Sequence, residues 1–150
     1  MTVFDECAMH IRAAAEGVTN WVSNLSNAAA LIWEYVPDIN WAGFYVMQNG
    51  RLELGPFQGK VACTAIEVGK GVCGTAVQEN ATQVVADVHA FSGHIACDSA
   101  SNAEIVIPLH KTGAVWGVLD IDSTTFSRFG EEERAGLEQL AALLEEIISR

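Results

Sequence analysis

The spacing of apolar residues predicts helices near the start of the chain. A helical repeat covers about Phe4 to Glu16, and Gly17 interrupts it. A second helix begins after a capping residue at Thr19 or Asn20 and ends near Pro37. Its apolar positions, which the spacing assigns to the core, are Trp21, Val22, Leu25, Ala28, Ala29, Ile32 and Trp33.

From Ile39 onward the apolar residues alternate with a period of two, which is typical of strands. Asn40–Met47 is predicted as a strand, with a hairpin signal at Asn49-Gly50 and a partner strand at Arg51–Pro56. Gly55–Gly59 is predicted as a loop. Four shorter segments follow, predicted as strand, helix, strand and loop in that order, at Thr64–Val68, Gly71–Glu79, Thr82–Val85 and Asp87–Ala100.

A second hairpin and a long helix complete the pattern. Ala103–His110 and Ala114–Ile121 are apolar strands joined at Lys111–Gly113. Gly130 opens the last helix, whose first turn holds three glutamates, at the end where the helix dipole favours negative charge. Terminal helices around a hairpin-built antiparallel sheet predict a single α+β domain over residues 1–150. The apolar stripe of the last helix is Leu137, Leu140, Ala141, Leu144, Ile147 and Ile148.

The charge balance excludes several classes of partner. Eight lysines and arginines stand against 19 aspartates and glutamates, a net charge of −11, which argues against binding to nucleic acid or to an anionic membrane surface. No apolar run reaches the ~18–20 residues of a membrane span, and the first residues lack the basic region of a signal peptide. We therefore expect a cytoplasmic protein, in which structural disulfides are rare.

Three of the four cysteines, Cys63, Cys73 and Cys97, stand among small residues and glycines in the middle of the chain. Thiols that a loop can bring together beside carboxylates favour thiol redox chemistry. The alternative is three small buried side chains. Cys7, on the first helix, is predicted to be a structural or incidental thiol. The carboxylates that follow are Asp98, Glu104, Asp120 and Asp122.

Two other kinds of site compete for this stretch. Gly69–Gly74 matches G-x-G-x-x-G between a predicted strand and a helix, as in dinucleotide-binding folds, but the short helix and the neighbouring hairpins favour a tight loop. His89 and His94 with the cysteines could assemble a zinc site. The closely spaced cysteine pair of structural zinc sites is absent from the sequence, so no metal is predicted.

Strand periodicity also places two further sets of side chains on common faces. Trp41 and Tyr45 lie on one face of their strand, as core aromatics or as walls for a small apolar group. Asp120 and Asp122 also share a face, and Glu104 lies at the start of the strand that is hairpinned to theirs.

Four motifs carry a family resemblance: Gly55–Cys63, Gly69–Ala76, Asp87–Ser101 and Gly117–Ser123. Together they resemble the free methionine-(R)-sulfoxide reductases, small enzymes with a GAF fold, over nearly the whole chain. The resemblance implies a central antiparallel sheet with the terminal helices packed on one face and the active-site loops on the other. It also implies a catalytic role for Cys97 and resolving roles for Cys63 and Cys73.

The resemblance further implies a substrate pocket. Its carboxylates are Glu104, Asp120 and Asp122. Its aromatic wall is Trp41 and Tyr45. Loop amides around Cys97, including those of Ile95 and Ala96, are expected to receive the substrate carboxylate.

The implied reaction is reduction of free L-methionine-(R)-sulfoxide. The Cys97 thiolate attacks the sulfur while a carboxyl group protonates the oxygen. The resulting sulfenic acid forms a disulfide with Cys73 or Cys63, which thioredoxin or a similar dithiol reduces. No flavin, nicotinamide or metal is implied, and a homodimer is allowed. The rival classes are a GAF sensor that binds a cyclic nucleotide without turnover and a metal or redox sensor.

Overall fold

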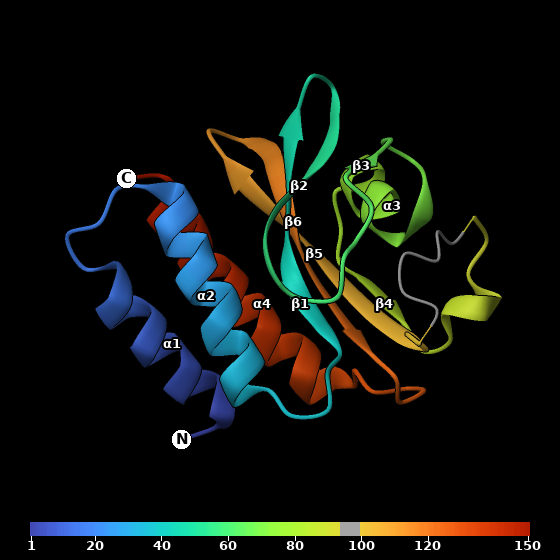
Figure 1. The fold of residues 1–150 in the computed structure, drawn as a ribbon, viewed down its shortest axis with the longest axis horizontal. Coiled ribbons are helices and arrows are strands. Elements are labelled where there is room, and N and C mark those ends of the chain that lie inside the picture. The colour runs from blue at the N-terminus through green and yellow to red at the C-terminus, as the bar shows by residue number, and fades with distance from the viewer. Residues whose placement is uncertain (94–99) are drawn as a thin grey trace.

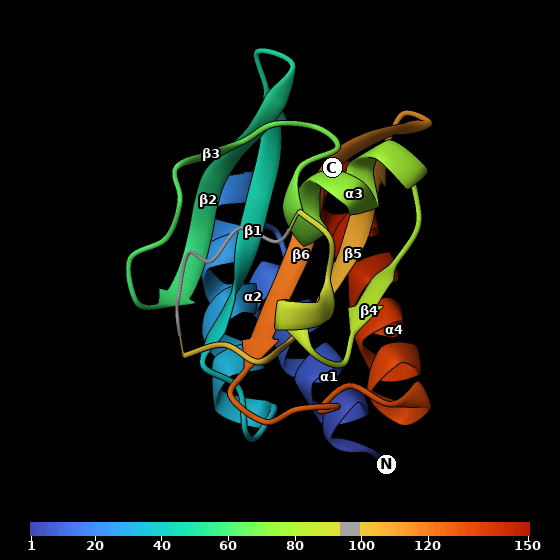
Figure 2. The same ribbon diagram turned by 90° about the vertical axis from the view of Figure 1, so that its right-hand side faces the viewer.

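A six-stranded sheet forms the middle layer of the molecule. Its strands lie in the order β3 (Ala65–Ile66), β2 (Arg51–Gly59), β1 (Trp41–Gln48), β6 (Ala114–Ser123), β5 (Ala103–Lys111) and β4 (Gln83–Val85). The computed structural model describes residues 1–93 and 100–150. Helices α1 (Val3–Ala15), α2 (Trp21–Tyr35) and α4 (Glu131–Ile148) cover one face of the sheet, and α3 (Gly71–Glu79) lies on the other (Figure 1). Figure 2 shows α3 and its connecting segments in front of the sheet, with the long helices behind it. The predicted α+β arrangement is confirmed.

Every strand pairing among the described residues is antiparallel. Because β3 pairs antiparallel with β2, the Gly69–Gly74 motif does not follow a strand of a parallel βαβ unit. Gly69 instead closes a tight loop, where its N–H donates to the carbonyl of Gly74 at 2.9 Å. The dinucleotide-binding alternative therefore lacks the fold that it needs. A 3-10 helix, η1, spans Val88–Ala90.

Capping side chains explain where the long helices begin. Thr2 and Asp5 form a reciprocal capping box at α1. At α2 the Asn20 side-chain oxygen accepts from the N–H of Val22 at 3.0 Å. At α4 the N–H of Gly130 donates to a carboxylate oxygen of Glu133 at 2.8 Å. Within the part of the chain that the structure describes, none of the helices combines the length and the apolar composition of a membrane span.

The main core lies between the long helices and the sheet. Ile105 and Leu119 of the sheet pack with Ile32 of α2 and Leu140 of α4, and all four are buried. Each such side chain stabilises the folded state by about 1.5–3 kcal/mol when it leaves water. Cys7 is 0% exposed in the same core, as predicted for a structural thiol.

Two side chains that the helical spacing assigned to this core lie outside it. Val22 is 47% exposed and Trp33 is 41% exposed. Helix α2 buries the stripe that runs from Leu25 to Ile32, and the two exposed side chains project beside that stripe. The prediction was wrong here because apolar spacing alone does not define how wide the buried face of a helix is.

Strand β2 continues through Gly55–Gly59, which the sequence predicted as a loop. The register between β1 and β2 shifts between Gly43 and Tyr45, and Phe57 is paired with Gly43 beyond the irregularity. β3 pairs only with the start of β2. Pro56, which has no N–H, therefore lies at an irregular position outside the β2–β3 pairing, where a proline is tolerated.

Gly136 of α4 packs directly against the ring of Phe4 in α1, and an added Cβ would overlap that ring. Overpacking a core costs ~1–3 kcal/mol, whereas alanine exceeds glycine in helix propensity by about 1 kcal/mol. Because both Phe4 and Gly136 are buried, we expect the packing effect to win. Gly136→Ala should lower the free energy of unfolding by ~1 kcal/mol, as measured by urea denaturation.

Ala135, an exposed neighbour on α4, provides the matched control. Ala135→Gly should cost ~1 kcal/mol through helix propensity alone. Phe4→Leu in the Gly136→Ala background should recover part of the loss, because the smaller side chain makes room. A Gly136→Ala protein that is more stable than wild type would contradict the close packing of α1 on α4.

Candidate active site

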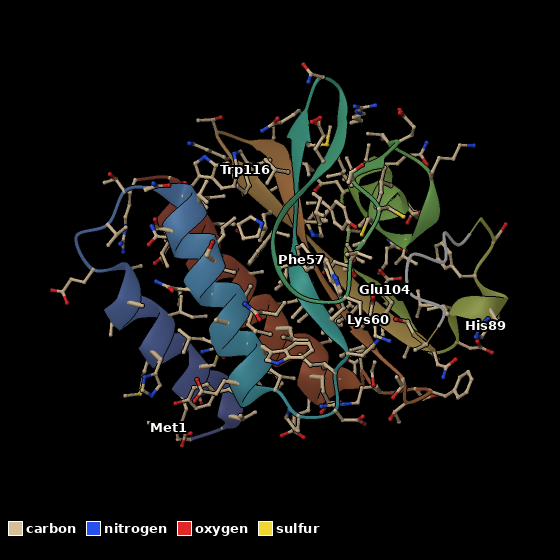
Figure 3. The ribbon with its side chains drawn as sticks, in the orientation of Figure 1. Met1, Phe57, Lys60, His89, Glu104 and Trp116 are labelled. Atoms are coloured by element: carbon tan, nitrogen blue, oxygen red, sulfur yellow. The ribbon has the colours of Figure 1, made fainter. Side chains whose placement is uncertain are left out.

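A pocket opens on the face of the sheet opposite the long helices. Figure 3 shows Glu104 on this side, away from α1, α2 and α4. The described lining comes from β1, β3, β5 and β6, from the segment between β2 and β3, and from the start of α3. It consists of Trp41, Tyr45, Val61, Ala62, Ile66, Lys70, Gly71, Val72, Cys73, Ser101, Glu104, Asp120 and Asp122.

Stacked aromatic rings form one wall of this pocket. The ring of Trp41 lies 5.9 Å from that of Tyr45 and 5.2 Å from that of Phe57, both nearly parallel to it. The Trp41 indole N–H donates to the carbonyl of Lys60 at 3.1 Å, and the Tyr45 hydroxyl donates to the carbonyl of Cys63 at 3.0 Å. These bonds fasten the segment after β2 to β1, so the wall and the region around Cys63 are held together.

Three carboxyl groups lie together on the neighbouring strands. In the β5–β6 register Glu104 is opposite Asp122, and Asp120 is opposite Val106. Glu104 is 8% exposed and Asp120 is 6% exposed. We call Glu104, Asp120 and Asp122 the acid cluster. The strand period that the sequence displayed accounts for their common face.

Burial and mutual repulsion hold protons on the acid cluster. Burial raises the pKa of Glu104 well above its ordinary range, and the neighbouring charges of Asp120 and Asp122 raise it further. Burial and the negative charge of Asp120 also raise the pKa of Asp122 well above its ordinary range, and hydrogen bonds from Glu104 and Ser101 oppose this only in part. Near neutral pH, Glu104 is therefore the carboxyl group best placed to hold and to donate a proton.

Cys73 supplies a further proton to this cluster. Its Sγ donates to Asp120 Oδ2 at 3.3 Å, and its side chain is buried at the start of α3. Burial raises the pKa of the Cys73 thiol well above its ordinary value, and the negative charges of Asp120 and Glu104 raise it further. Cys73 is therefore a thiol, not a thiolate, in this arrangement.

The described cysteines occupy different chemical states. Cys63 is disulfide-bonded, whereas Cys7 and Cys73 are free and buried. Three residues that the sequence predicted for this site, Cys97, Ile95 and Ala96, lie outside the described residues, and so does His94.

Sequence reasoning missed several residues of this site. The sequence predicted a loop at Phe57, so this residue was not assigned to the aromatic wall. Its aromatic side chain, in the segment that follows the β1–β2 hairpin, could have indicated that role. Lys70, which lines the pocket at the start of α3, stands inside the glycine-rich motif. Ser101 and Asn40 bond to one another at 3.0 Å beside Asp122. Ser101 ends the Asp87–Ser101 motif, but the sequence assigned no role to either residue.

The same geometry bears on metal binding. Of the residues considered for a zinc site, His89 bonds Asn102 through its Nε2 at 3.0 Å, and His94 and Cys97 lie outside the described residues. One ligand atom each of Cys73, Glu104 and Asp120 lies within 4.8 Å of the others. Shared protons join these three groups, as the Cys73 bond to Asp120 illustrates, and an ion would have to displace them. We therefore interpret the group as a proton-sharing cluster.

Comparison with known proteins agrees with these features. The chain matches the GAF domain family over residues 4–148. It is 55% identical over 137 residues to the free methionine-R-sulfoxide reductase of Escherichia coli (strain K12), which covers 91% of this chain and 83% of that protein. The chain belongs to the GAF-domain family of free methionine-R-sulfoxide reductases. The predicted family resemblance is confirmed.

Solved structures of free methionine-R-sulfoxide reductases share this fold. The reduced form of the Staphylococcus aureus protein superposes with a TM-score of 0.94 at 44% identity, over 99% of this chain and 96% of that one. The reductase from Neisseria meningitidis, solved in complex with its substrate, gives a TM-score of 0.93 at 42% identity, over 97% and 87% of the two chains. The predicted GAF-like sheet and helix arrangement is confirmed.

Two thiols of this family member should resist alkylation. Cys7 is 0% exposed and Cys73 is 4% exposed. Burial raises the pKa of Cys7 to about 12 and that of Cys73 well above its ordinary value. Because the thiolate is the reacting form, iodoacetamide at mildly alkaline pH should label neither residue in the native protein. Peptide mapping by mass spectrometry measures the labelling.

Unfolding in guanidinium is the control for this experiment, and it should expose both thiols to rapid labelling. Rapid labelling of Cys73 in the native protein would contradict a protonated, buried thiol. It would mean that the start of α3 opens readily to solvent.

Proposed function

We propose that this protein reduces free methionine-(R)-sulfoxide to methionine by thiol chemistry at Cys97. Family membership supports the reaction, since relatives that cover most of the chain bear that name. The observation that carries the proposal is the acid cluster, where burial keeps a proton on Glu104 beside an aromatic wall. A sulfoxide sulfur becomes electrophilic when its oxygen is protonated, and such a carboxylic acid supplies that proton.

The lining of the pocket suits the groups of a free amino acid. The face of Trp41 offers an apolar wall for the S-methyl group. Asp122 of the acid cluster pairs with the ammonium group, whose positive charge favours the ionised form of that carboxyl group. Lys70 contributes a positive charge to the pocket lining, and the main-chain N–H groups at the start of α3 contribute partial positive charges. Together with the loop amides near Ile95 and Ala96, they receive the substrate carboxylate.

The chemical step transfers oxygen to a cysteine. The Cys97 thiolate attacks the sulfur of the substrate while Glu104 protonates the oxygen. The oxygen then bonds to the Cys97 sulfur as the substrate sulfur–oxygen bond and the transient bond between the two sulfurs break, and methionine leaves. Cys97 keeps the oxygen as a sulfenic acid, so the cysteine is oxidised by two electrons and the substrate is reduced by two.

The resolving step forms a disulfide. We assign this step to Cys63, because it is the described cysteine that takes part in a disulfide, whereas Cys73 is a free thiol. The Cys63 thiolate attacks the sulfenic sulfur of Cys97, a disulfide forms, and the oxygen leaves as water. Thioredoxin or a similar dithiol then reduces the disulfide by exchange. Cys73 keeps its proton and supports Asp120 throughout.

Turnover of the two substrate epimers tests the proposed function. With dithiothreitol, the protein should convert free L-methionine-(R)-sulfoxide to methionine and leave the S epimer unreacted. The methyl group must face the aromatic wall, the oxygen must face the acid cluster, and the sulfur must face the nucleophile. Only one of the two epimers at sulfur can meet all three requirements. Chromatography of the amino acids measures the product. Cys97→Ser should be inactive, because a hydroxyl is a far poorer nucleophile toward sulfur.

Cys7→Ala is the matched control, since Cys7 lies in the helical core on the other face of the sheet. Its turnover should remain near that of the wild type. Equal turnover of both epimers would contradict the proposed site. Saturable binding of a cyclic nucleotide without turnover would identify a GAF sensor instead.

The roles of the resolving cysteines are separable. One equivalent of substrate should oxidise the reduced enzyme to a disulfide between Cys97 and Cys63, detected by peptide mapping. Cys63→Ser should keep a single turnover and lose repeated turnover with thioredoxin, because the sulfenic acid has lost its partner thiol. Cys73→Ala should still recycle, although the first step slows when Asp120 loses its thiol donor.

A Cys97–Cys73 disulfide would reverse this assignment. So would a Cys63→Ser enzyme that recycles normally with thioredoxin. Dithiothreitol, which attacks a sulfenic acid directly, should partly rescue the Cys63→Ser variant and so demonstrates that its first step is intact.

A further inference from the structure

Three hydrogen bonds join Asn40, Ser101 and Asp122 into a closed circuit. The main-chain N–H of Asn40 donates to the main-chain carbonyl of Asp122 at 2.9 Å. The Asn40 side-chain Nδ2 donates to Ser101 Oγ at 3.0 Å. The Ser101 hydroxyl donates to Asp122 Oδ2 at 3.4 Å. The circuit therefore connects the residue before β1, the segment before β5 and the end of β6.

Ser101 is well placed to act on the pocket. It is 5% exposed and lines the pocket beside the acid cluster. Because Ser101 Oγ accepts a hydrogen bond from Asn40, its own hydrogen is directed to Asp122, and the two bonds polarise one another. The 3.4 Å separation is at the long end for a hydroxyl donor, so its individual effect is modest.

The residue after Ser101 anchors this arrangement to β6. The N–H of Asn102 donates to the carbonyl of Ser123 at 2.8 Å, and the Asn102 side-chain amide donates to the carbonyl of Thr124 at 2.7 Å. Ser101 follows Cys97 closely in sequence. Ser101 and Asn102, which lead into β5, are therefore attached to β6 next to Asp122.

We propose that Ser101 and Asn40 are positioning residues of the reductase, which hold Asp122 in place and favour its charged form. The transferable proton then stays on Glu104, and Asp122 is free to pair with the ammonium group of the substrate. This inference rests on the proposed function. It adds two residues to the site that do not themselves exchange protons with the substrate.

Some of the groups around Asp122 raise its pKa, and others lower it. Burial raises its pKa, as does the negative charge of Asp120, while hydrogen bonds from Glu104 and Ser101 lower it. Of these two donors, Glu104 can lose its proton and Ser101 cannot in the working pH range. Ser101 therefore favours the ionised form of Asp122 at every working pH. Among the described residues, the other titratable groups that line the pocket around Asp122 are Cys73, Tyr45 and Lys70.

Removal of the Ser101 hydroxyl should change the pH dependence of the reaction. In Ser101→Ala the charged form of Asp122 loses a donor, so the pKa of Asp122 rises. The acid limb of kcat/KM, which reports ionisations of the free enzyme, should move to higher pH by about half a unit to one unit, as expected for one lost hydrogen bond. Well above that limb, kcat/KM should return to near the wild-type value, and KM should change more than kcat.

Two further variants test the circuit itself. Ser101→Thr keeps the hydroxyl and should restore the wild-type limb. Asn40→Asp places a carboxylate that competes for the Ser101 hydrogen, so it should shift the limb in the same direction as Ser101→Ala. Ser123→Ala is the matched control, because its buried hydroxyl donates to the carbonyl of Asp38 at 2.7 Å and should leave the limb in place.

A measurement without turnover separates this inference from the proposed function. A carbon-13 NMR titration of the carboxyl groups reads the pKa of Asp122 directly, and that pKa should be higher in Ser101→Ala than in the wild type. An unchanged Asp122 pKa, or a loss of activity that is equal at every pH, would overturn the inference while leaving the reductase proposal intact. A wild-type protein without turnover would overturn the proposed function instead, and the NMR titration would still decide whether Ser101 acts on Asp122.

Discussion

The crowding of three carboxyl groups on one face of a sheet, with Glu104 and Asp120 buried, is the constraint on which the site depends. Glu104, Asp120 and Asp122 cannot all be ionised so close together away from water. They remain because the β5–β6 register holds them side by side and because shared protons reduce the charge. Neutral donors lie at either side: the Cys73 thiol donates to one oxygen of Asp120, and the Ser101 hydroxyl donates to one oxygen of Asp122.

The same strands supply both stability and chemistry, because their side chains alternate. Leu119 and Ile121 of β6 enter the helical core, whereas Asp120 and Asp122 enter the pocket. β1 divides in the same way, with Phe44 in the core and Trp41 and Tyr45 in the wall. The extensive apolar burial on one face stabilises the sheet, and that stability offsets the cost of desolvated acids on the other.

The described cysteines show how environment separates three chemically identical side chains. Cys7 is an apolar filler of the helical core. Cys73 is a protonated donor at the start of α3. Cys63 belongs to a segment fastened to β1 by Trp41 and Tyr45 and is the one that forms a disulfide. Burial suppresses the thiolate in the first two, which is why we assign the resolving step to the third.

The sequence by itself determined the elements and the common faces. Helical and alternating periods placed both hairpins and the long helices, and the two-residue spacing put Asp120 with Asp122 and Trp41 with Tyr45, because local backbone geometry imposes these periods. Tertiary structure alone decided the exposure of Trp33, the extension of β2 past Pro56 and the protonation of Cys73. It alone brought Asn40 and Ser101 to Asp122, since hydrogen bonds between residues far apart in the chain leave no periodic signal. The protonation of Cys73 follows from its burial, and the rest of the folded chain decides which side chains are removed from water.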